Sequence, residues 1–351
     1  MKIPIPVTVL GATGAVGQRF VQLLENHPWF EVACLTGSDR SVGKTYQESC
    51  RWILPTAMPE HVRQLRIMPS ETDSIPNQLV FSALPSDHAR QIEPELAKAG
   101  RVVCSNASAF RMEPDVPILL PEVNPEHIEL VDVQRKKRGW SGAILTNPNC
   151  TSTGMTVALK ALQEPFGVKR VFAVSLQALS GAGYPGVAAL DILDNVLPYI
   201  AGEEEKVEFE PLKMLGKLAN ETILPAKLTI SAHTNRVAVS EGHTVCLSIE
   251  LEQPVKLEEV ARALESYPPP SICQGLPSTP NPVIQLMKEI DRPQPRQDRN
   301  AGRGMTTVIG RLRPDPLFHL KMVVLSHNTI RGAAGGSIYN AELYISQYGM
   351  K

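Results

Sequence analysis

The first 146 residues alternate short runs of β-branched and apolar residues with longer stretches in which apolar residues recur at helical spacing. The expected strands cover residues 7–10, 31–36, 79–83, 101–104 and 143–146, and the expected helices cover 16–26 and 87–99. This alternation favours a parallel sheet, because each helix returns the chain to the edge where the next strand starts. The pattern therefore predicts an α/β protein whose N-terminal domain is Rossmann-like, with helices on both faces of the sheet.

The pattern changes beyond residue 150. A helical stretch over 155–162 is followed by longer β-runs, which favour a mixed or antiparallel sheet. These runs cover residues 170–178, 243–252, 306–312 and 320–326. Proline-rich stretches at 267–282 and 293–295 predict long surface loops. The last segment, 332–348, is helical in pattern and is expected to return to the first domain. We expect one domain of residues 1–149 plus 328–351, and a second, α+β domain of residues 150–327.

Composition and charge exclude several classes of partner. The chain has 351 residues, is 43% hydrophobic and 20% charged, and carries a formal net charge of −1. Its largest basic cluster, 135–138, is typical of a solvated helix end or loop. No apolar run approaches the roughly 18 residues that a membrane span needs. We therefore expect neither nucleic acid nor a membrane as a partner.

The cysteines and the N-terminus indicate the compartment. Six cysteines are scattered without a Cys-x-x-Cys pair, which argues against structural zinc and against a disulfide framework. Residues 1–6 lack the long apolar core of a secretion signal. A reducing cytoplasm fits both observations, and no metal is expected.

A glycine-rich turn follows the first expected strand and opens the first expected helix. Glycines at 11, 14 and 17 allow a tight turn and bring backbone amides against a pyrophosphate at the positive end of the helix. The expected contacts from this turn are Gly11, Thr13, Gly14, Ala15 and Val16. The sequence therefore predicts a dinucleotide site.

The end of the second expected strand indicates which dinucleotide binds. An NAD site usually places an acidic residue here, whereas an NADP site places arginine and hydroxyl groups around the 2′-phosphate. Ser38, Arg40 and Ser41 favour NADP, and Asp39 is the opposing feature. Ser82, at the end of the third expected strand, is the next expected contact.

Cys150 lies where a strand-like stretch gives way to a helical one. A cysteine at a helix N-terminus faces unpaired amides and the positive end of the helix dipole, which favour the nucleophilic thiolate. The same amides can hold an oxyanion beside the sulfur, and Thr151 and Ser152 can cap the turn. A buried cysteine that only fills space is the alternative, and this stretch alone does not decide between them.

Two later segments carry further reactive groups. Residues 177–186 combine Gln177 with small residues that let the backbone approach a ligand closely. Residues 233–243 offer Arg236 for a carboxylate or phosphate and His243 for proton transfer. Each residue taken singly has a structural explanation, but with Cys150 they form a candidate catalytic set.

Together these segments resemble the aspartate-semialdehyde dehydrogenases, most closely the archaeal and fungal branch. The matching stretches are residues 11–17, 38–44, 105–108, 121–124, 147–151, 180–186, 235–243 and 332–336. They follow the family's order over almost the whole chain. The resemblance implies an NADPH-dependent enzyme that reductively dephosphorylates L-4-aspartyl phosphate to L-aspartate 4-semialdehyde, on the route to lysine (through diaminopimelate), threonine and methionine.

The resemblance also implies residue roles. The nucleophile, which forms a thioester, falls on Cys150, the acid/base on His243, and the glutamine that orients the thioester on Gln177. The arginine for the substrate α-carboxylate falls on Arg236, and the one for the phosphate on Arg111. Further implied substrate contacts are Asn149, Glu210 and Lys213, although acidic residues 203–208 crowd the last two. Further implied cofactor contacts are Ser180, Gly181 and Asn328.

Three other functions remain open from the sequence. Malonyl-CoA reductase and N-acetyl-glutamyl-phosphate reductase use similar folds and chemistry, and a non-catalytic NADP-binding sensor would need only the glycine-rich turn. The enzyme alternatives act on small molecules. The second domain is expected to carry catalysis and dimerisation in a homodimer or homotetramer.

Overall fold

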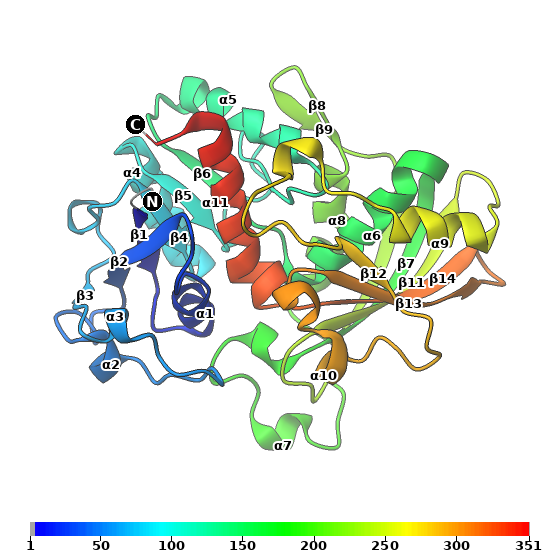
Figure 1. The fold of residues 1–351 in the computed structure, drawn as a ribbon, viewed down its shortest axis with the longest axis horizontal. Coiled ribbons are helices and arrows are strands. Elements are labelled where there is room, and N and C mark those ends of the chain that lie inside the picture. Colours follow the sequence, from blue (N-terminus) through cyan, green and yellow to red (C-terminus); the bar gives the residue numbers. More distant parts are fainter. Residues whose placement is uncertain (1–3, 351) are drawn as a thin grey trace.

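The computed structural model describes residues 4–350, so residues 1–3 and 351 of the expected N-terminal segment and domains lie outside the described residues. The described chain forms two six-stranded sheets and one two-stranded hairpin (Figure 1). No helix among these residues is long and apolar enough to cross a membrane.

The first sheet has the strand order β3-β2-β1-β4-β5-β6, and all its pairings are parallel. Its strands are β1 Ile5–Leu10, β2 Phe30–Thr36, β3 Ile67–Met68, β4 Leu79–Ser82, β5 Val102–Ser105 and β6 Ala143–Thr146. Helices α1 (Ala15–Leu23), α4 (Ser86–Lys98) and α5 (Leu130–Arg138) connect or flank these strands. The predicted Rossmann-like domain is confirmed, and the basic cluster 135–138 forms the last turn of α5.

The second sheet is mixed, as the sequence predicts. Its order is β10-β7-β11-β14-β13-β12, with parallel pairings at both outer edges and antiparallel pairings between. Its strands are β7 Val168–Gln177, β10 Thr229–Arg236, β11 His243–Leu251, β12 Ile284–Leu286, β13 Thr307–Pro314 and β14 Leu320–Ser326. Helices α6 (Cys150–Phe166), α8 (Glu203–Met214) and α9 (Leu257–Glu265) pack with this sheet around one apolar core.

Shorter elements complete the chain. The short helices are α2 Tyr46–Ser49, α3 Glu60–Arg63, α7 Ala189–Ile192 and α10 Pro295–Asp298, and the hairpin is β8 Lys217–Ala219 with β9 Thr222–Leu224. The 3₁₀ turns are Thr72–Ser74, Pro125–Glu129, Leu179–Ala182, Ser271–Cys273 and Ala301–Gly304.

The C-terminal segment packs against the first sheet. Its apolar residues, from Ile330 to Tyr344, belong to the same core as Phe20 of α1 and Leu145 of β6. The expected helix 332–348 is divided: a π-type turn, Ile330–Ala334, precedes α11 (Gly335–Tyr348). The cause is the non-helical backbone of Ala333, with φ −149° and ψ −105°. In Figure 1, α11 stands between the first sheet and the second domain.

Candidate active site

A cavity of about 850 Å³ lies between the carboxyl edge of the first sheet and the second domain. It brings together residues that are far apart in the sequence and that come from both sheets. The expected site residues that line it are Thr13, Gly14, Ala15, Val16, Arg40, Arg111, Asn149, Cys150, Gln177, Ser180, Gly181, Arg236 and Asn328. Those expected but not at its wall are Gly11, Ser38, Ser41, Ser82, Glu210, Lys213 and His243.

Cys150 is the first residue of α6, so the helix begins five residues earlier than its apolar pattern indicates. The residue that caps it is Asn149, not the expected Thr151 or Ser152. The Asn149 Oδ1 accepts hydrogen bonds from the amides of Thr151 at 2.9 Å and Ser152 at 3.1 Å. These two amides are therefore occupied by the cap, while the N–H of Cys150 itself lowers the pKa of its thiol.

The resting thiol of Cys150 does not have the lowered pKa that a helix N-terminus alone predicts. Burial raises the pKa of the Cys150 thiol to about 12, and the nearby Glu203 carboxylate adds to this rise. The guanidinium groups of Arg111 and Arg236 act in the opposite direction. Desolvation outweighs the helix dipole because the thiolate loses more hydration than the helix end and the two cations replace.

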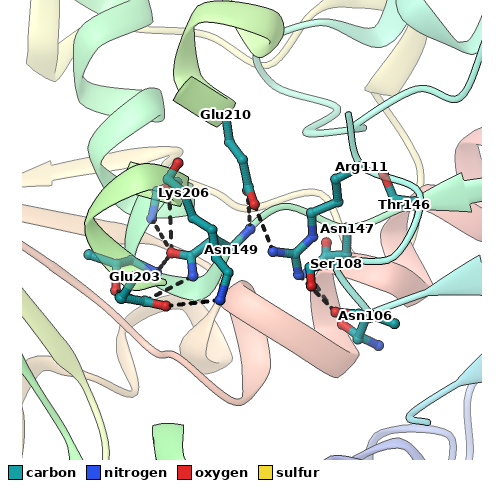
Figure 2. A network of polar contacts seen from close by, with 12 residues as sticks. Asn106, Ser108, Arg111, Thr146, Asn147, Asn149, Glu203, Lys206 and Glu210 are labelled. Carbon is teal, nitrogen blue, oxygen red and sulfur yellow. Dashed lines mark hydrogen bonds and ion pairs between the residues drawn. The ribbon is translucent and has the colours of Figure 1, made fainter. Parts of the chain in front are cut away.

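Glu203 is the acidic residue at the cavity wall, whereas the sequence shows it only as one of several glutamates that crowd this region. Its Oε1 accepts hydrogen bonds from Asn149 Nδ2 at 2.9 Å and Gln177 Nε2 at 3.0 Å. The Lys206 ammonium lies 3.6 Å from its Oε2. Figure 2 shows Lys206 and Asn149 beside the Glu203 carboxylate. Both Glu203 and Lys206 line the cavity.

Glu210 holds Arg111 beside the nucleophile. One Glu210 oxygen accepts from Arg111 Nη1 at 2.8 Å and the other accepts from the backbone amide of Asn149 at 2.6 Å. A second Arg111 nitrogen donates to the carbonyl of Asn106 at 2.8 Å (Figure 2). Arg111 is therefore held in a fixed position at the cavity wall. The Glu210 carboxylate that holds it also binds the backbone amide of Asn149, next to Cys150.

Lys213 faces away from the cavity. Its ammonium donates to the backbone carbonyls of Arg111, Glu113 and Val116, each at 2.7 Å. All three of its protons are used, so it fixes the loop that carries Arg111.

Glu203 and Lys206 form the Glu-x-x-Lys pair at the cavity wall, whereas the expected pair, Glu210 and Lys213, does not line the cavity. The two pairs are seven residues apart, about two helical turns, so they share one face of α8. The spacing in the sequence therefore cannot show which of the two Glu–Lys pairs lies at the cavity wall.

His243 opens β11, and its ring is fixed by the backbone. Its Nδ1 accepts a hydrogen bond from the amide of Ala178 at 3.0 Å, so the neutral ring carries its proton on Nε2. Burial lowers the pKa of His243 to about 3, and Arg236 and His327 lower it further. The Nε2 is buried and has no hydrogen-bond partner within residues 4–350.

Gly181 lies against His243 and Arg236 at the cavity wall. A Cβ at this position would lie 3.1 Å from His243 Nε2 and 2.6 Å from Arg236 Nη1. Only glycine leaves these two groups open to a ligand. Arg236, at the end of β10, also donates to the carbonyl of Ala178 at 2.9 Å, which holds it in the same small cluster.

The glycine-rich turn fits a pyrophosphate. Gly11 has φ +66°, and a Cβ there would lie 2.9 Å from the carbonyl oxygen of Ala83. Gly14 is the N-cap of α1 and has no side-chain cap. Since Gly14, Ala15 and Val16 line the cavity, the first-turn amides of α1 face it and are available to an anion.

The remaining expected cofactor residues divide into two groups. Arg40 lines the cavity and makes no hydrogen bond or ion pair with the described residues, so its guanidinium is available to a phosphate. Asn328 Nδ2 donates to Ser180 Oγ at 2.8 Å, at the cavity wall. Ser82 is fully buried, so its side chain is not the expected contact. The residues after it, 83–85, line the cavity instead.

The fold and site define a class: a dinucleotide-dependent dehydrogenase with a cysteine at the carboxyl edge of its cofactor sheet. Family models agree with this class. Residues 6–131 match "Semialdehyde dehydrogenase, NAD binding domain", and residues 159–331 match "Semialdehyde dehydrogenase, dimerisation domain".

Known proteins narrow the class. The chain is 51% identical to an aspartate-semialdehyde dehydrogenase of Archaeoglobus fulgidus, over 97% of this chain and 98% of that protein. It is 42% identical to one of Saccharomyces cerevisiae, over 97% of each. Among solved structures it is similar to aspartate semialdehyde dehydrogenase with NADP from Candida albicans, with a TM-score of 0.90 and 39% identity over 99% of this chain and 100% of that one. The chain belongs to the aspartate-semialdehyde dehydrogenase family.

Membership confirms the predicted activity, NADPH-dependent reductive dephosphorylation of aspartyl phosphate in amino-acid biosynthesis. The match to a dimerisation domain supports an oligomer. The relatives support small molecules as substrates. None of these relatives supports malonyl-CoA reductase or a non-catalytic sensor.

Proposed function

We propose that Cys150 is the nucleophile and that Arg111 and Arg236 hold the two anionic ends of aspartyl phosphate. The observation that carries this is the cavity itself, which gathers Cys150, Gln177, Arg111 and Arg236 from four separate elements. Both guanidinium groups are close enough to influence the Cys150 thiol. The substrate has a phosphate and an α-carboxylate, and a bidentate arginine suits each. We assign Arg111 to the phosphate and Arg236 to the carboxylate.

Glu203 and Lys206 complete the substrate site in this proposal. The Glu203 carboxylate suits the substrate ammonium group, and its bonds to Asn149 and Gln177 hold those side chains in place. Lys206 adds positive charge beside it. Glu210 and Lys213 act one step further away, by fixing Arg111 and its loop.

The first step forms a thioester on Cys150. The sulfur bonds to the acyl carbon, the carbon–oxygen bond to phosphate breaks, and phosphate leaves with the electron pair. The thiol must lose its proton as it attacks, since burial keeps it protonated at rest, and the departing phosphate takes up this proton. Arg111 stabilises the leaving phosphate and Gln177 orients the thioester.

The second step releases the aldehyde. The hydride that reduces the thioester comes from NADPH when it is bound. His243 Nε2–H donates a hydrogen bond to the oxygen that becomes negative as the hydride adds, which stabilises this oxyanion. As the carbonyl double bond re-forms, the carbon–sulfur bond breaks and the sulfur leaves with the electron pair, which gives the semialdehyde. The freed Cys150 takes up a proton from water and returns to the thiol. The neutral ring is suited to this because Ala178 occupies Nδ1, which leaves the proton on Nε2, next to Gly181 of the cavity wall.

The first-turn amides of α1, with Thr13 and Gly11, would hold the pyrophosphate, and Arg40 with Ser38 and Ser41 the 2′-phosphate. Ser180, Gly181 and Asn328 would lie near the nicotinamide. We place the nucleotide domain at 1–149 plus 328–351 and the catalytic and dimerisation domain at 150–327. The C-terminal helix supports this division, since it packs on the first sheet.

The oligomer is a homodimer or homotetramer in this proposal. Exposed apolar side chains offer a surface for a second copy: Phe172 and Leu176 on β7, Leu190 on α7, and Leu193 and Tyr199 after α7. The six cysteines form no disulfide within residues 4–350, which fits a reducing compartment, and we place the enzyme in the cytoplasm.

One comparison tests the proposed substrate. The purified protein should reduce NADP⁺ in the presence of aspartate semialdehyde and phosphate, and should not oxidise NADPH with malonyl-CoA at a comparable rate. Turnover of malonyl-CoA in preference to the semialdehyde would replace the substrate assignment. Turnover of neither would contradict the proposed function.

A further inference from the structure

An ion pair connects the cofactor helix to the segment that carries His243. Arg19 lies in the middle of α1, and its nearly buried guanidinium pairs with the carboxylate of Glu241 in the second domain. The Thr329 hydroxyl donates to the same carboxylate oxygen at 2.9 Å. We call Arg19, Glu241 and Thr329 the latch. It joins the two sides of the cavity behind its wall.

The latch is continuous with the catalytic histidine. Glu241 is followed by Gly242 and then His243. The Gly242 amide donates to Asn328 Oδ1 at 2.8 Å, and Asn328 Nδ2 donates to Ser180 Oγ at 2.8 Å. The backbone amide of Ser180 in turn donates to the carbonyl of Ser240 at 3.1 Å. Residues 240–243 and the cavity wall at 178–181 therefore form one bonded unit.

Packing and hydrogen bonds restrict the backbone of residues 240–243 to one position. Gly242 has φ +96°, and a Cβ there would meet Pro295, Arg299 and Leu325 at 3.2–3.3 Å. Arg299 also donates to the backbone carbonyl of Glu241 at 3.2 Å. The unit is packed from the second domain on these sides, and the latch is its charged contact with α1.

The latch is costly to break because its charged groups are largely shielded from water. A desolvated guanidinium is costly unless a carboxylate faces it, so breaking the pair leaves an uncompensated charge. Arg19 Nη1 donates to Gln22 on its own helix at 2.8 Å, which fixes the side chain before it crosses. The titratable group that also faces Glu241 is His327, whose Nε2 lies 3.7 Å from Oε2. Burial lowers the pKa of His327 to about 4, so near pH 7 it is neutral and does not replace Arg19.

We propose that the latch sets the position of His243 relative to the cofactor helix, so that seating of the dinucleotide on α1 also aligns the catalytic histidine. This inference rests on the proposed role of His243. Neither Arg19 nor Glu241 lines the cavity, so both are positioning residues. Hydride transfer should be the sensitive step, because its two partners are held by different domains and small misplacements have large effects on rate.

The test compares Arg19→Met, Glu241→Gln, the double variant, the conservative Arg19→Lys and a control, Arg63→Met, which removes an exposed Arg–Glu pair on α3. The first readout is amide hydrogen exchange in a peptide spanning 237–243, with and without NADP⁺. In the unmodified protein and in the control, NADP⁺ should slow this exchange by about tenfold. In Arg19→Met and Glu241→Gln the slowing should be under about twofold, within the range of coupling between contacting pairs.

The second readout is kinetic. Both single variants should lower kcat by roughly tenfold and raise the deuterium isotope effect with deuterated NADPH, while the NADPH Kd stays within about threefold. The double variant should be no worse than either single one, and Arg19→Lys should recover most of the rate. Unchanged NADP⁺-induced protection in Arg19→Met, or multiplicative losses in the double variant, would overturn the latch. The exchange readout needs no turnover, so its failure is distinguishable from failure of the proposed function.

Discussion

Replacing Glu203 with glutamine should make Cys150 react faster with iodoacetamide. Iodoacetamide alkylates the thiolate, so its rate follows the thiolate fraction. A thiol pKa of about 12 leaves a thiolate fraction of about 10⁻⁴ at pH 8, and each pH unit changes it about tenfold. Removing a nearby like charge typically shifts a pKa by about one unit or more, so Glu203→Gln should accelerate alkylation by on the order of tenfold at fixed pH.

The assay measures loss of the unmodified Cys150 peptide by mass spectrometry, since the exposed Cys246 would dominate a bulk thiol count. In the unmodified protein the rate should rise about tenfold per pH unit from pH 7 to 10, because the raised pKa lies above this window. The control is Glu205→Gln, an exposed carboxylate on the same helix. A plateau between pH 6 and 8, or equal rates in the two glutamine variants, would refute the argument that burial and Glu203 hold Cys150 as a thiol.

Arg40→Ala should raise the KM for NADPH by one to two orders of magnitude and leave that for NADH nearly unchanged, because a charge-assisted contact contributes roughly 1.5–3 kcal/mol; equal losses with both cofactors in steady-state assays would give Arg40 another role. His243→Asn should lower kcat by about 10²–10⁴ with nearly constant KM values, and a KM effect at unchanged kcat would make it a binding residue. Burial raises the pKa of Glu93 to about 7, above its unfolded value, so its carboxyl costs stability increasingly from about pH 4.5 to 7 and fully above. Urea unfolding of Glu93→Gln should therefore show a relative gain of about 3 kcal/mol between pH 4 and 8, compared with exposed Glu95→Gln, and parallel pH profiles for the two variants would exclude this effect.

Most of the fold was accessible from the sequence because its strands are apolar runs between clear helices. β14 has the predicted bounds, and the five strands predicted for the first sheet agree with β1, β2, β4, β5 and β6 within a residue or two. Short or polar elements were not accessible. β3 has two residues, and β12 is a three-residue strand between two proline-rich stretches that predict loops. Their strand state depends on pairing with β2 and β13 rather than on their own residues.

The site was predictable where a sequence motif determines the backbone conformation. It was not predictable where it depends on charged side chains that are distant in the sequence and close in the fold. The glycine turn and Cys150 lie at the expected strand–helix junctions. The pKa of Cys150 was not predictable, because it depends on burial and on Glu203, which is 53 positions away in the chain. The helical repeat of α8 likewise conceals that Glu203, and not Glu210, faces the cavity.

The account depends most on a thioester at Cys150, and one measurement tests it directly. The protein is mixed with aspartate semialdehyde and NADP⁺ without phosphate, so that the acyl-enzyme cannot be released to phosphate. We predict a burst of about one NADPH per active site and an aspartyl adduct on the Cys150 peptide, with neither in Cys150→Ser. A full burst without an adduct on Cys150, or a burst that persists in Cys150→Ser, would contradict the account.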